Sequence, residues 1–321
     1  MTDATPGRPQ LSMTLYTFSK DDPGNWDYLV SQAVLADECG VDRLALSDHI
    51  AFGENMDAYA DPAKGGTAGG KQPTGPDGHW LEPLSTISFL AALTSQVRFG
   101  TNILLAALRR PAALANQLST IDVLSKGRID LGVGVGWQRE EYEAVGLSFE
   151  GRGRLLDHTL EVCQTLWSEN SASYSSDELS FSNIHQQPKP IQPGGVPVWV
   201  SGTTNDRAMK RLATFGTGWI PWGPDAADIT SGIERMRAQV SKHGGDPSKM
   251  SVQGSLKVER ADDAIDLEAT MAPVAELADA GVTDFRIGMP IPDPKTGKAQ
   301  LTETVEAFRQ ATAHQTKSRR V

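Results

Sequence analysis

The sequence has few cysteines, a minority of basic residues and no long apolar run. Its 321 residues include two cysteines, Cys39 and Cys163, too few for a disulfide framework or a cysteine-lined zinc site. Thirty Lys and Arg residues stand against forty Asp and Glu residues, so the net charge is −10 at pH 7. This balance argues against nucleic-acid coats and binders of anionic membranes, because both need surplus positive charge. No stretch approaches the roughly 18 consecutive apolar residues of a membrane-spanning helix.

Motifs of several common enzyme classes are also absent. The patterns H-E-x-x-H, G-x-x-x-x-G-K-[ST], C-x-x-C and G-x-S-x-G do not occur, so zinc-protease, P-loop, dithiol and hydrolase chemistry have no support. Five histidines have no metal-ligand spacing, and we expect them on the surface: His79, His158, His185, His243 and His314. The opening residues MTDATPGRPQ lack the apolar segment of a secretory signal, so we expect a cytoplasmic protein.

What the sequence does have is an alternation of predicted strands and helices. Apolar runs predict strands at 11–19, 43–49, 97–106, 128–136, 196–202, 218–222, 250–259 and 283–288. Amphipathic or capped segments predict helices at 26–39, 83–96, 111–127, 152–167, 206–216, 225–243, 264–281 and 301–314. About eight such units favour a closed (β/α)8 TIM barrel, with an open doubly wound sheet as the alternative. No linker or composition break divides the chain, so we expect a single domain over residues 1–321.

Two segments interrupt this alternation. Residues 50–82 follow the second predicted strand and are rich in Gly and Pro, with Tyr59 and Trp80 among them. A loop of this length is usually a lid or disordered, and the Gly hinges and aromatic residues favour a lid. Residues 173–184, between the fourth and fifth strands, predict an irregular or hairpin excursion.

The carboxyl ends of the strands are where a barrel places its active site. Asp48 and His49 end the second predicted strand. An imidazole there can transfer protons near neutral pH or hydrogen-bond a reacting oxygen, and the adjacent carboxylate can hold a polar ring edge. The alternative is that Asp48 caps the following turn and His49 is an ordinary surface residue.

Three further segments lie at predicted strand ends. Gly132–Gly136 is not a dinucleotide fingerprint, because Arg139 stands at the third glycine position when the motif is counted from Gly134. These glycines indicate either close packing of the strand or close approach of a flat cofactor to its backbone. Ser201–Asp206 predicts either an anion site or an ordinary helix N-cap. Arg109 and Arg110 stand at a helix start, where they either meet an anionic ligand or are solvated.

Six stretches, in this order, carry a family resemblance: LSDH (46–49), WLEPL (80–84), RFGTNILLAALRRP (98–111), DVLSKGRIDLGVGVGWQREEYEAVG (122–146), FEGRGRLLDHTLEVCQTLW (149–167) and VWVSGTTNDRAMKRLATFGTGWIP (198–221). Together they resemble the luciferase-like monooxygenase superfamily, and within it the coenzyme F420-dependent oxidoreductases. The resemblance implies a TIM barrel with the tricyclic ring of the cofactor in its mouth.

The resemblance also implies roles for individual residues. Asp48 and His49 would lie at the site of hydride transfer, and Thr101 and Asn102 would line the ring, with a cis peptide at Asn102–Ile103. The cofactor tail would contact Gly134, Gly136 and Trp137, and its phosphate would be held by Gly202, Thr203, Thr204 and Asn205. Some relatives carry an acid where this chain has Trp137. Proton transfer is then left to His49, or to Glu140 or Glu141 if their loop folds inward, although we expect both glutamates to be solvated.

The expected function is hydride transfer between coenzyme F420 and a small organic substrate. The alternatives are an FMN-dependent two-component monooxygenase served by a separate reductase, and a cofactor-binding barrel without turnover. No residue in the sequence decides between the two rings. A homodimer is implied by the resemblance, and no metal is expected.

Overall fold

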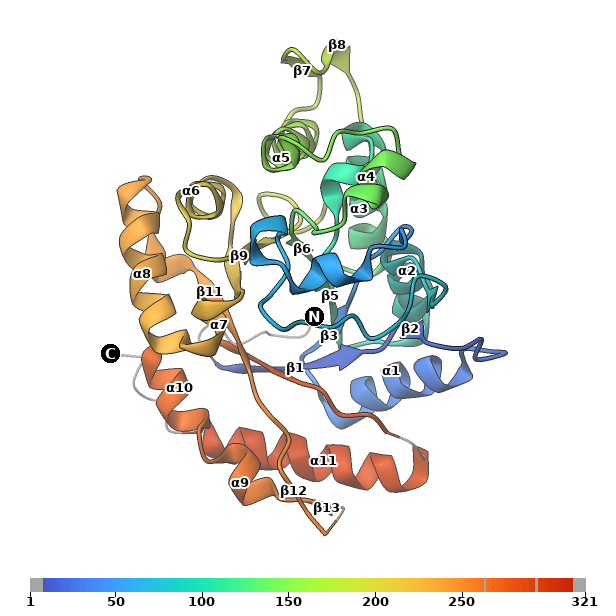
Figure 1. The fold of residues 1–321 in the computed structure, drawn as a ribbon, viewed down its shortest axis with the longest axis vertical. Helices are drawn as coiled ribbons and strands as arrows, with labels where there is room; N and C mark the ends of the chain where they lie inside the picture. The colour runs from blue at the N-terminus through green and yellow to red at the C-terminus, as the bar shows by residue number, and fades with distance from the viewer. Residues whose placement is uncertain (1–7, 263, 292–293, 314–321) are drawn as a thin grey trace.

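Eight parallel strands close into a barrel in the computed structural model of the protein (Figure 1). The structure describes residues 8–262, 264–291 and 294–313. The barrel strands are β1 (Gln10–Leu15), β3 (Arg43–Leu46), β5 (Arg98–Thr101), β6 (Ile129–Val133), β9 (Val198–Gly202), β10 (Gly218–Pro221), β11 (Ser251–Ser255) and β14 (Asp284–Ile287). The (β/α)8 prediction is confirmed, and the doubly wound alternative is wrong, because β14 pairs with β1 from Gln10↔Asp284 onward and closes the sheet.

Helices follow the barrel strands and cover the barrel from outside. They are α1 (Asp27–Cys39), α2 (Pro83–Leu93), α3 (Pro111–Leu124), α4 (Arg139–Ala144), α5 (Arg152–Ser168), α6 (Asp206–Phe215), α7 (Pro224–Ala227), α8 (Ile229–Lys242), α9 (Leu267–Met271), α10 (Val274–Ala280) and α11 (Pro294–Ala311). Pro83 and Pro111 occupy the first turns of α2 and α3, where a missing N–H costs nothing. Gly40 ends α1 in the left-handed conformation, with φ of 81°.

Three predicted helices have different bounds in the structure. The helix expected at 264–281 divides into α9 and α10 around Pro273, which cannot continue a helix interior. The helix expected at 225–243 divides into α7 and α8, and the Asp228 carboxylate accepts the Ser231 N–H to begin α8. The last helix begins at Pro294 and not at Leu301.

Several strands end earlier than the apolar pattern predicts. The strand expected at 97–106 stops at Thr101, because the Asn102–Ile103 peptide is cis and the chain then turns into the 3-10 helix η3 (Ala106–Leu108). This cis bond is the one that the resemblance implies. The strand expected at 11–19 divides into β1 and the short β2 (Phe18–Ser19). The polar residues that follow each strand therefore lie in loops at the rim of the barrel.

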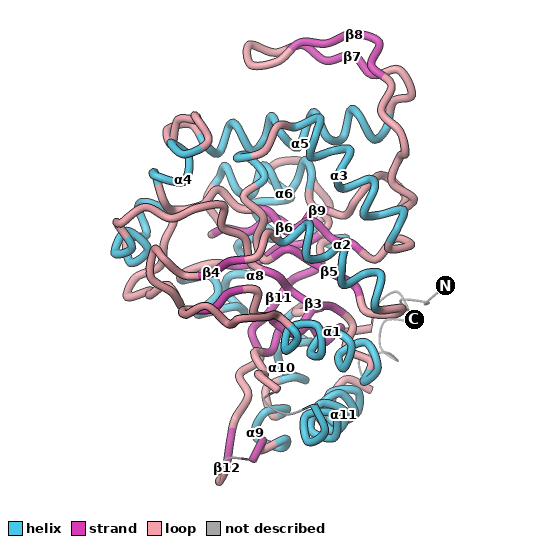
Figure 2. Tube along the Cα trace, turned by 90° about the vertical axis from the view of Figure 1, so that its right-hand side faces the viewer, coloured by secondary structure: helices cyan, strands magenta, loops and turns pink. Residues whose placement is uncertain are grey.

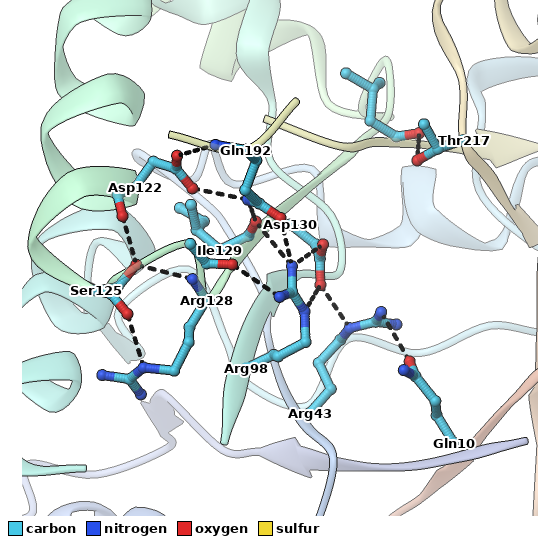
Figure 3. A network of polar contacts seen from close by, with 12 residues as sticks. Gln10, Arg43, Arg98, Asp122, Ser125, Arg128, Ile129, Asp130, Gln192 and Thr217 are labelled. Atoms are coloured by element: carbon cyan, nitrogen blue, oxygen red, sulfur yellow. Dashed lines mark hydrogen bonds and ion pairs between the residues drawn. The ribbon is translucent and has the colours of Figure 1, made fainter. Parts of the chain in front are cut away.

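The barrel interior is polar, and the apolar core lies between the strands and the surrounding helices. Leu11, Met13 and Leu15 of β1 are fully buried on the helix side. On the inner side, Arg43 donates to Asp130 at 2.9 Å and Asp130 also accepts from Arg98 at 2.7 Å (Figure 3). Burial alone would raise the pKa of Asp130, but the two guanidinium groups outweigh it and hold that pKa below its usual range.

This inner network extends along the barrel axis. Arg43 also donates to Asp284, which accepts from Ser12 at 2.6 Å and from Gln253 at 3.4 Å. Gln253 in turn accepts the Asn102 amide at 2.7 Å, near the rim. The space enclosed between these side chains is about 10 Å³, enough for one water. The space between these described side chains is therefore too small for a ligand larger than water.

Two segments extend beyond the βα units. Residues 50–82 contain the 3-10 helices η1 (Met56–Ala60) and η2 (Pro62–Lys64), and β4 (His79–Trp80) pairs antiparallel with β2. This insertion lies over one end of the barrel in both views (Figures 1 and 2). The excursion is a hairpin of β7 (Ala172–Ser175) and β8 (Ser180–Ile184) that projects away from the barrel (Figure 2). A smaller hairpin joins β12 (Arg260–Ala261) and β13 (Ala264–Ile265).

Other sequence predictions meet the structure in different ways. His158 was expected on the surface but is buried in α5, where its Nδ1 lies 3.1 Å from the Tyr174 hydroxyl. His314 lies outside the described residues. Within the described ranges, no helix combines the length and apolarity that crossing a membrane requires, and no group of three or more His, Cys, Asp or Glu side chains could hold a metal ion.

Candidate functional site

The rim at the carboxyl ends of the strands brings together residues that are distant in the sequence. Strand register places Leu46 beside Thr101, and Val133 beside Val200. Asp48–His49, Asn102, Gly134 and Gly202 therefore all leave the barrel at the same end. The sequence-predicted residues share one face, as a single site requires.

Asp48 is buried, and both oxygens of its carboxylate accept hydrogen bonds from the protein. Its oxygens accept from Arg109 at 2.7 and 3.0 Å and from the Leu105 N–H at 2.8 Å, and 4% of the residue is exposed. Arg109 also donates to Glu82 at 2.9 Å. The carboxylate thus secures the segment that follows β5. Oδ2 accepts two hydrogen bonds, whereas Oδ1 accepts one and keeps a lone pair.

Arg109 is half-buried and pairs with two carboxylates of the protein, so the expectation that it is solvated is wrong, and the alternative of an anionic ligand stays a prediction. Burial lowers the pKa of Arg109, but its hydrogen bonds and ion pairs with Asp48 and Glu82 raise it further above the usual value. Burial raises the pKa of Glu82, but the Ser85 N–H and Arg109 together lower it below its usual range. The guanidinium joins the loop after β3 to the start of α2. Arg110, its neighbour, is exposed.

His49 is paired with a buried glutamate. Its Nδ1 lies 3.3 Å from Oε2 of Glu141, and the other oxygen of Glu141 accepts the Ile50 N–H at 2.6 Å. Glu141 is 1% exposed, so the expectation that it is solvated is wrong. The sequence misleads here because Glu141 lies in the short α4, whose first turn folds against residues 49–53. Glu140 is half-buried beside Gly53, where an added β-carbon would overlap its side chain.

Aromatic rings surround the His49 imidazole. Phe52 and Trp80 lie 4.3 and 4.9 Å away between ring centroids, and Trp137 lies at 6.0 Å. The side chain of His49 is 10% exposed. An imidazole in this setting has limited access to water, and its Nε2 donates to and accepts from no described protein group.

Thr101 and Asn102 lie at the rim, but both side chains have protein partners. The Thr101 hydroxyl donates to the Gly132 carbonyl at 2.7 Å, and the Asn102 amide donates to Gln253. The cis peptide after Asn102 brings Leu104 beside Val133, where the Leu104 N–H donates to the Gly132 carbonyl. The segment after β5 therefore runs along the end of β6.

The glycines of β6 make this close approach possible. A β-carbon at Gly134 would lie 2.7 Å from Ile103 Cδ1, and one at Gly136 would lie 2.9 Å from Leu105 Cδ2. The closest neighbours of these glycines are thus side chains of the protein, as the packing interpretation expects. The Trp137 side chain that follows is 5% exposed, and its Nε1 is buried with no hydrogen-bond partner.

The segment expected to hold a phosphate already contacts a carboxylate of the protein. The Thr204 N–H donates to Asp225 at 2.7 Å, and its hydroxyl lies 3.2 Å from both carboxylate oxygens. Asp225 is 3% exposed and is paired with Arg235. The Asn205 side chain caps α6 by accepting the Ala208 N–H at 3.0 Å, as the N-cap alternative predicts, and its amide donates to the Thr203 hydroxyl. Gly202 ends β9 with φ of 153°.

Arg286 is a rim residue that the sequence analysis missed. It lies two residues after Asp284 in β14, on the same inner side and nearer the carboxyl end. Burial lowers its pKa, against the attraction of Asp284, Tyr16 and Tyr59. Its guanidinium makes no hydrogen bond with any side chain or carbonyl in the described ranges. The signal available in the sequence was the pair of charged residues two positions apart, Asp284 and Arg286, within a predicted strand.

The insertion contacts the rim at several points. Gln138 exchanges two hydrogen bonds with the Gly53 backbone, at 3.0 and 3.1 Å. The Trp222 indole, after β10, donates to the Gly66 carbonyl at 3.0 Å. Tyr59 lies between the rings of Trp137 and Trp222, at 5.4 and 6.3 Å. These contacts hold the insertion across the ends of β6 and β10.

Two sequence relatives have names that state a cofactor, and the two cofactors differ. The chain is 30% identical to the F420-dependent glucose-6-phosphate dehydrogenase of Kineococcus radiotolerans, over 63% of this chain and 54% of that protein. It is 29% identical to the FMNH2-dependent dimethylsulfone monooxygenase of Pseudomonas fluorescens, over 47% of this chain and 42% of that protein. An uncharacterised protein of Mycobacterium tuberculosis is 30% identical over 65% of this chain and 70% of its own length.

A solved structure with the same fold is an F420-dependent secondary alcohol dehydrogenase in complex with an F420-acetone adduct. The TM-score is 0.72 at 18% identity, over 94% of this chain and 99% of that one. The family described as luciferase-like monooxygenase matches residues 9–318. The barrel, the rim and this match across nearly the whole chain agree, and the protein belongs to the luciferase-like monooxygenase family.

Proposed function

We propose that this protein transfers hydride between coenzyme F420 and a small organic substrate, with His49 moving the accompanying proton. Its family is one of oxidoreductases and monooxygenases, and the F420-dependent relative supports the choice of coenzyme. The observation that carries the proposal is the buried pair of His49 and Glu141 at the carboxyl rim. Such a pair can position an imidazole for proton transfer, which turnover requires and cofactor binding alone does not.

Three polar groups near the mouth of the barrel support the binding of a planar ring with polar edges. The Thr17 hydroxyl and the Trp137 indole nitrogen are buried there without partners, and the Arg286 guanidinium donates to no described group. Such groups can hydrogen-bond the carbonyl oxygens of a deazaflavin or flavin ring. When bound, the deazaflavin supplies a carbon centre that accepts or donates hydride. The protein positions the ring, limits the access of water to it and transfers the proton.

The anionic tail fits the predicted phosphate segment less well. Asp225 already occupies the N–H and hydroxyl of Thr204, and a phosphate would be repelled by that carboxylate. We therefore assign the tail to the Thr203 side of this segment, where the hydroxyl accepts from Asn205 and keeps its own hydrogen free to donate.

Glu141 and His49 divide the work of proton transfer. Glu141 accepts a hydrogen bond from the Nδ1–H group and thereby favours the tautomer whose Nε2 carries a lone pair. Nε2 can then take a proton from a substrate hydroxyl during oxidation, or return it during reduction. The rings of Phe52, Trp80 and Trp137 limit the access of water to this imidazole.

An FMN-dependent monooxygenase is the second candidate, because the FMNH2-dependent relative is similarly identical over a shorter length. Titration of the purified protein with each cofactor, followed by fluorescence, separates the two. We expect F420 to bind in the micromolar range. Micromolar binding of FMN with no change in F420 fluorescence would refute the proposal.

We further propose that residues 50–82 act as a lid and that the protein is a homodimer. The hydrogen bond from Trp222 to Gly66 holds the insertion to β10, so Trp222→Phe should speed proteolysis within 50–82 and raise the KM for the cofactor.

Phe89 and Leu93 of α2 and Leu124 of α3 are 57%, 46% and 71% exposed. These apolar side chains support a subunit contact at α2 and α3, which sedimentation velocity can test.

A further inference from the structure

A second cavity, of about 850 Å³, opens at the opposite end of the barrel. Its lining includes Gln10, Arg43, Arg98 and Ser251, which begin β1, β3, β5 and β11, and Thr217, which precedes β10. Amino ends of parallel strands share one end of a barrel, so this cavity is separate from the rim that carries His49. Its volume is within the range of small-molecule sites.

The charged side chains that line this cavity are predominantly cationic. Among the described residues they are Arg8, Arg43, Arg98, Arg237 and Lys249, with one carboxylate, Asp130. Asp130 is already shared between Arg43 and Arg98 (Figure 3). Arg8 is paired at 2.7 Å with Asp42, which does not line the cavity. The Lys249 side chain is 80% exposed, and its Nζ lies 3.5 Å from a carboxylate oxygen of Asp246. The Asp130 carboxylate is therefore already paired with Arg43 and Arg98 and does not neutralise the other cationic side chains of the lining.

Several donors on the lining remain available to a ligand. Arg237 of α8 makes no hydrogen bond or ion pair with a described residue, and Gly281 leaves room for its guanidinium, since an added β-carbon would lie 2.5 Å from Nη2. Arg43 has five N–H groups, and its partners Asp130, Asp284 and Gln10 use one each. Two N–H groups of Arg43 are left, at the floor of the cavity.

The cavity also offers apolar contact. The ring of Trp199 lines it, and the Arg43 guanidinium carbon lies 4.4 Å from the centroid of that ring. Pro197, Met236, Pro247, Met250 and Val252 complete this side of the lining. A ligand that matches the whole cavity combines an anionic group with a flat or apolar body.

We propose that this cavity is a second binding site, for a small molecule that carries a phosphate or carboxylate group. Arg237 and Lys249 hold the anionic group at the entrance, and the free N–H groups of Arg43 and the ring of Trp199 contact the rest of the ligand at the floor. The site is independent of the hydride-transfer chemistry proposed for the rim.

Calorimetric titration of the full chain with pyrophosphate and with citrate, at matched ionic strength, tests this site. We expect at least one of them to bind with a Kd below about 1 mM. The double variant Arg237→Ala/Lys249→Ala should weaken that binding about tenfold or more, because it removes two charged donors. The matched control Arg154→Ala/Lys257→Ala also removes two positive charges, 78% and 81% exposed, from the other end of the barrel, and should bind as wild type does.

Three results would overturn the proposal. One is that neither anion binds the wild-type protein at millimolar concentration. Another is that the control pair weakens binding as much as Arg237→Ala/Lys249→Ala, which would indicate attraction by net charge alone. The third is displacement of the bound anion by whichever of F420 or FMN the protein binds, since that would place the anion at the rim. Because cofactor binding is measured separately, a failure here is distinct from a failure of the proposed function.

Discussion

His49 and Glu141 lie 92 positions apart, yet Nδ1 of the imidazole is 3.3 Å from a carboxylate oxygen that solvent does not reach. The same carboxylate holds the Ile50 N–H, so it secures both the ring and the backbone beside it. We expect His49→Ala to lower kcat by about 10²- to 10⁴-fold, the usual contribution of a general acid or base, while the Kd for the cofactor stays near that of wild type.

Glu141→Gln tests the positioning role of the glutamate. Glutamine can turn its amide to donate to Nδ1, which would favour the other tautomer and leave a hydrogen on Nε2. We expect kcat to fall and its pH profile to change, while the cofactor Kd changes less than twofold. Steady-state kinetics from pH 5 to 9 provide the measurement, and a profile identical to that of wild type would show that Glu141 only supports the fold.

Arg109 joins Asp48 and Glu82 across three segments of the chain. Arg109→Met would leave the buried Asp48 carboxylate without its partner, which typically costs about 3 to 5 kcal/mol. The exposed neighbour supplies the control, because Arg110→Ala removes the same charge and should change stability by less than about 0.5 kcal/mol. Urea unfolding measures both variants. Equal, small effects would mean that the Arg109 ion pairs do not stabilise the loop after β3.

Gly132 and Gly134 differ in what an added methyl group would meet. At Gly132 it would overlap the Thr101 carbonyl oxygen, which is backbone and cannot move away, whereas at Gly134 it meets the flexible end of Ile103. Gly134→Ala should therefore cost about 1 to 3 kcal/mol, the usual effect of overpacking. Gly132→Ala should cost more and reduce the yield of folded protein. Thermal unfolding of the two variants gives the order, and the reverse order would contradict this account.

Asp37 predicts a pH dependence of stability. Burial raises its pKa, but the N–H groups of Val97, Ser95 and Gln96 outweigh this effect and hold the pKa below the usual 3.8. A carboxylate whose pKa is lower in the folded state stabilises the fold above its unfolded-state value. That contribution is lost as the pH falls through the lower folded-state value.

Asp37→Asn should therefore unfold more easily than wild type at pH 7, with the difference shrinking below pH 3.8. Urea midpoints measured between pH 2.5 and 7 provide the test. Asp21→Asn removes a charge from an exposed position and serves as the control. A difference between Asp37→Asn and wild type that stays constant over this range would rule out the proposed linkage.

The sequence by itself determined most elements of the barrel, because apolar spacing and the flanking Gly and Pro residues act within a few positions of the chain. Pro111 begins α3 and Gly40 ends α1 for local reasons, and the resemblance located the rim residues and the cis peptide at Asn102–Ile103. Bounds were less predictable where one capping residue or one turn decides them, as at Asp228 and Pro273.

Only the tertiary structure decided how the charged groups are paired. Glu141 reaches His49, Arg109 reaches Asp48, and Asp225 occupies the donors of Thr204, across separations of 92, 61 and 21 residues. The same holds for the cationic cavity, whose lining comes from the amino ends of strands spread over the whole chain. Such contacts depend on the closed path of the barrel, and no periodicity in the sequence records which distant charges that path brings together.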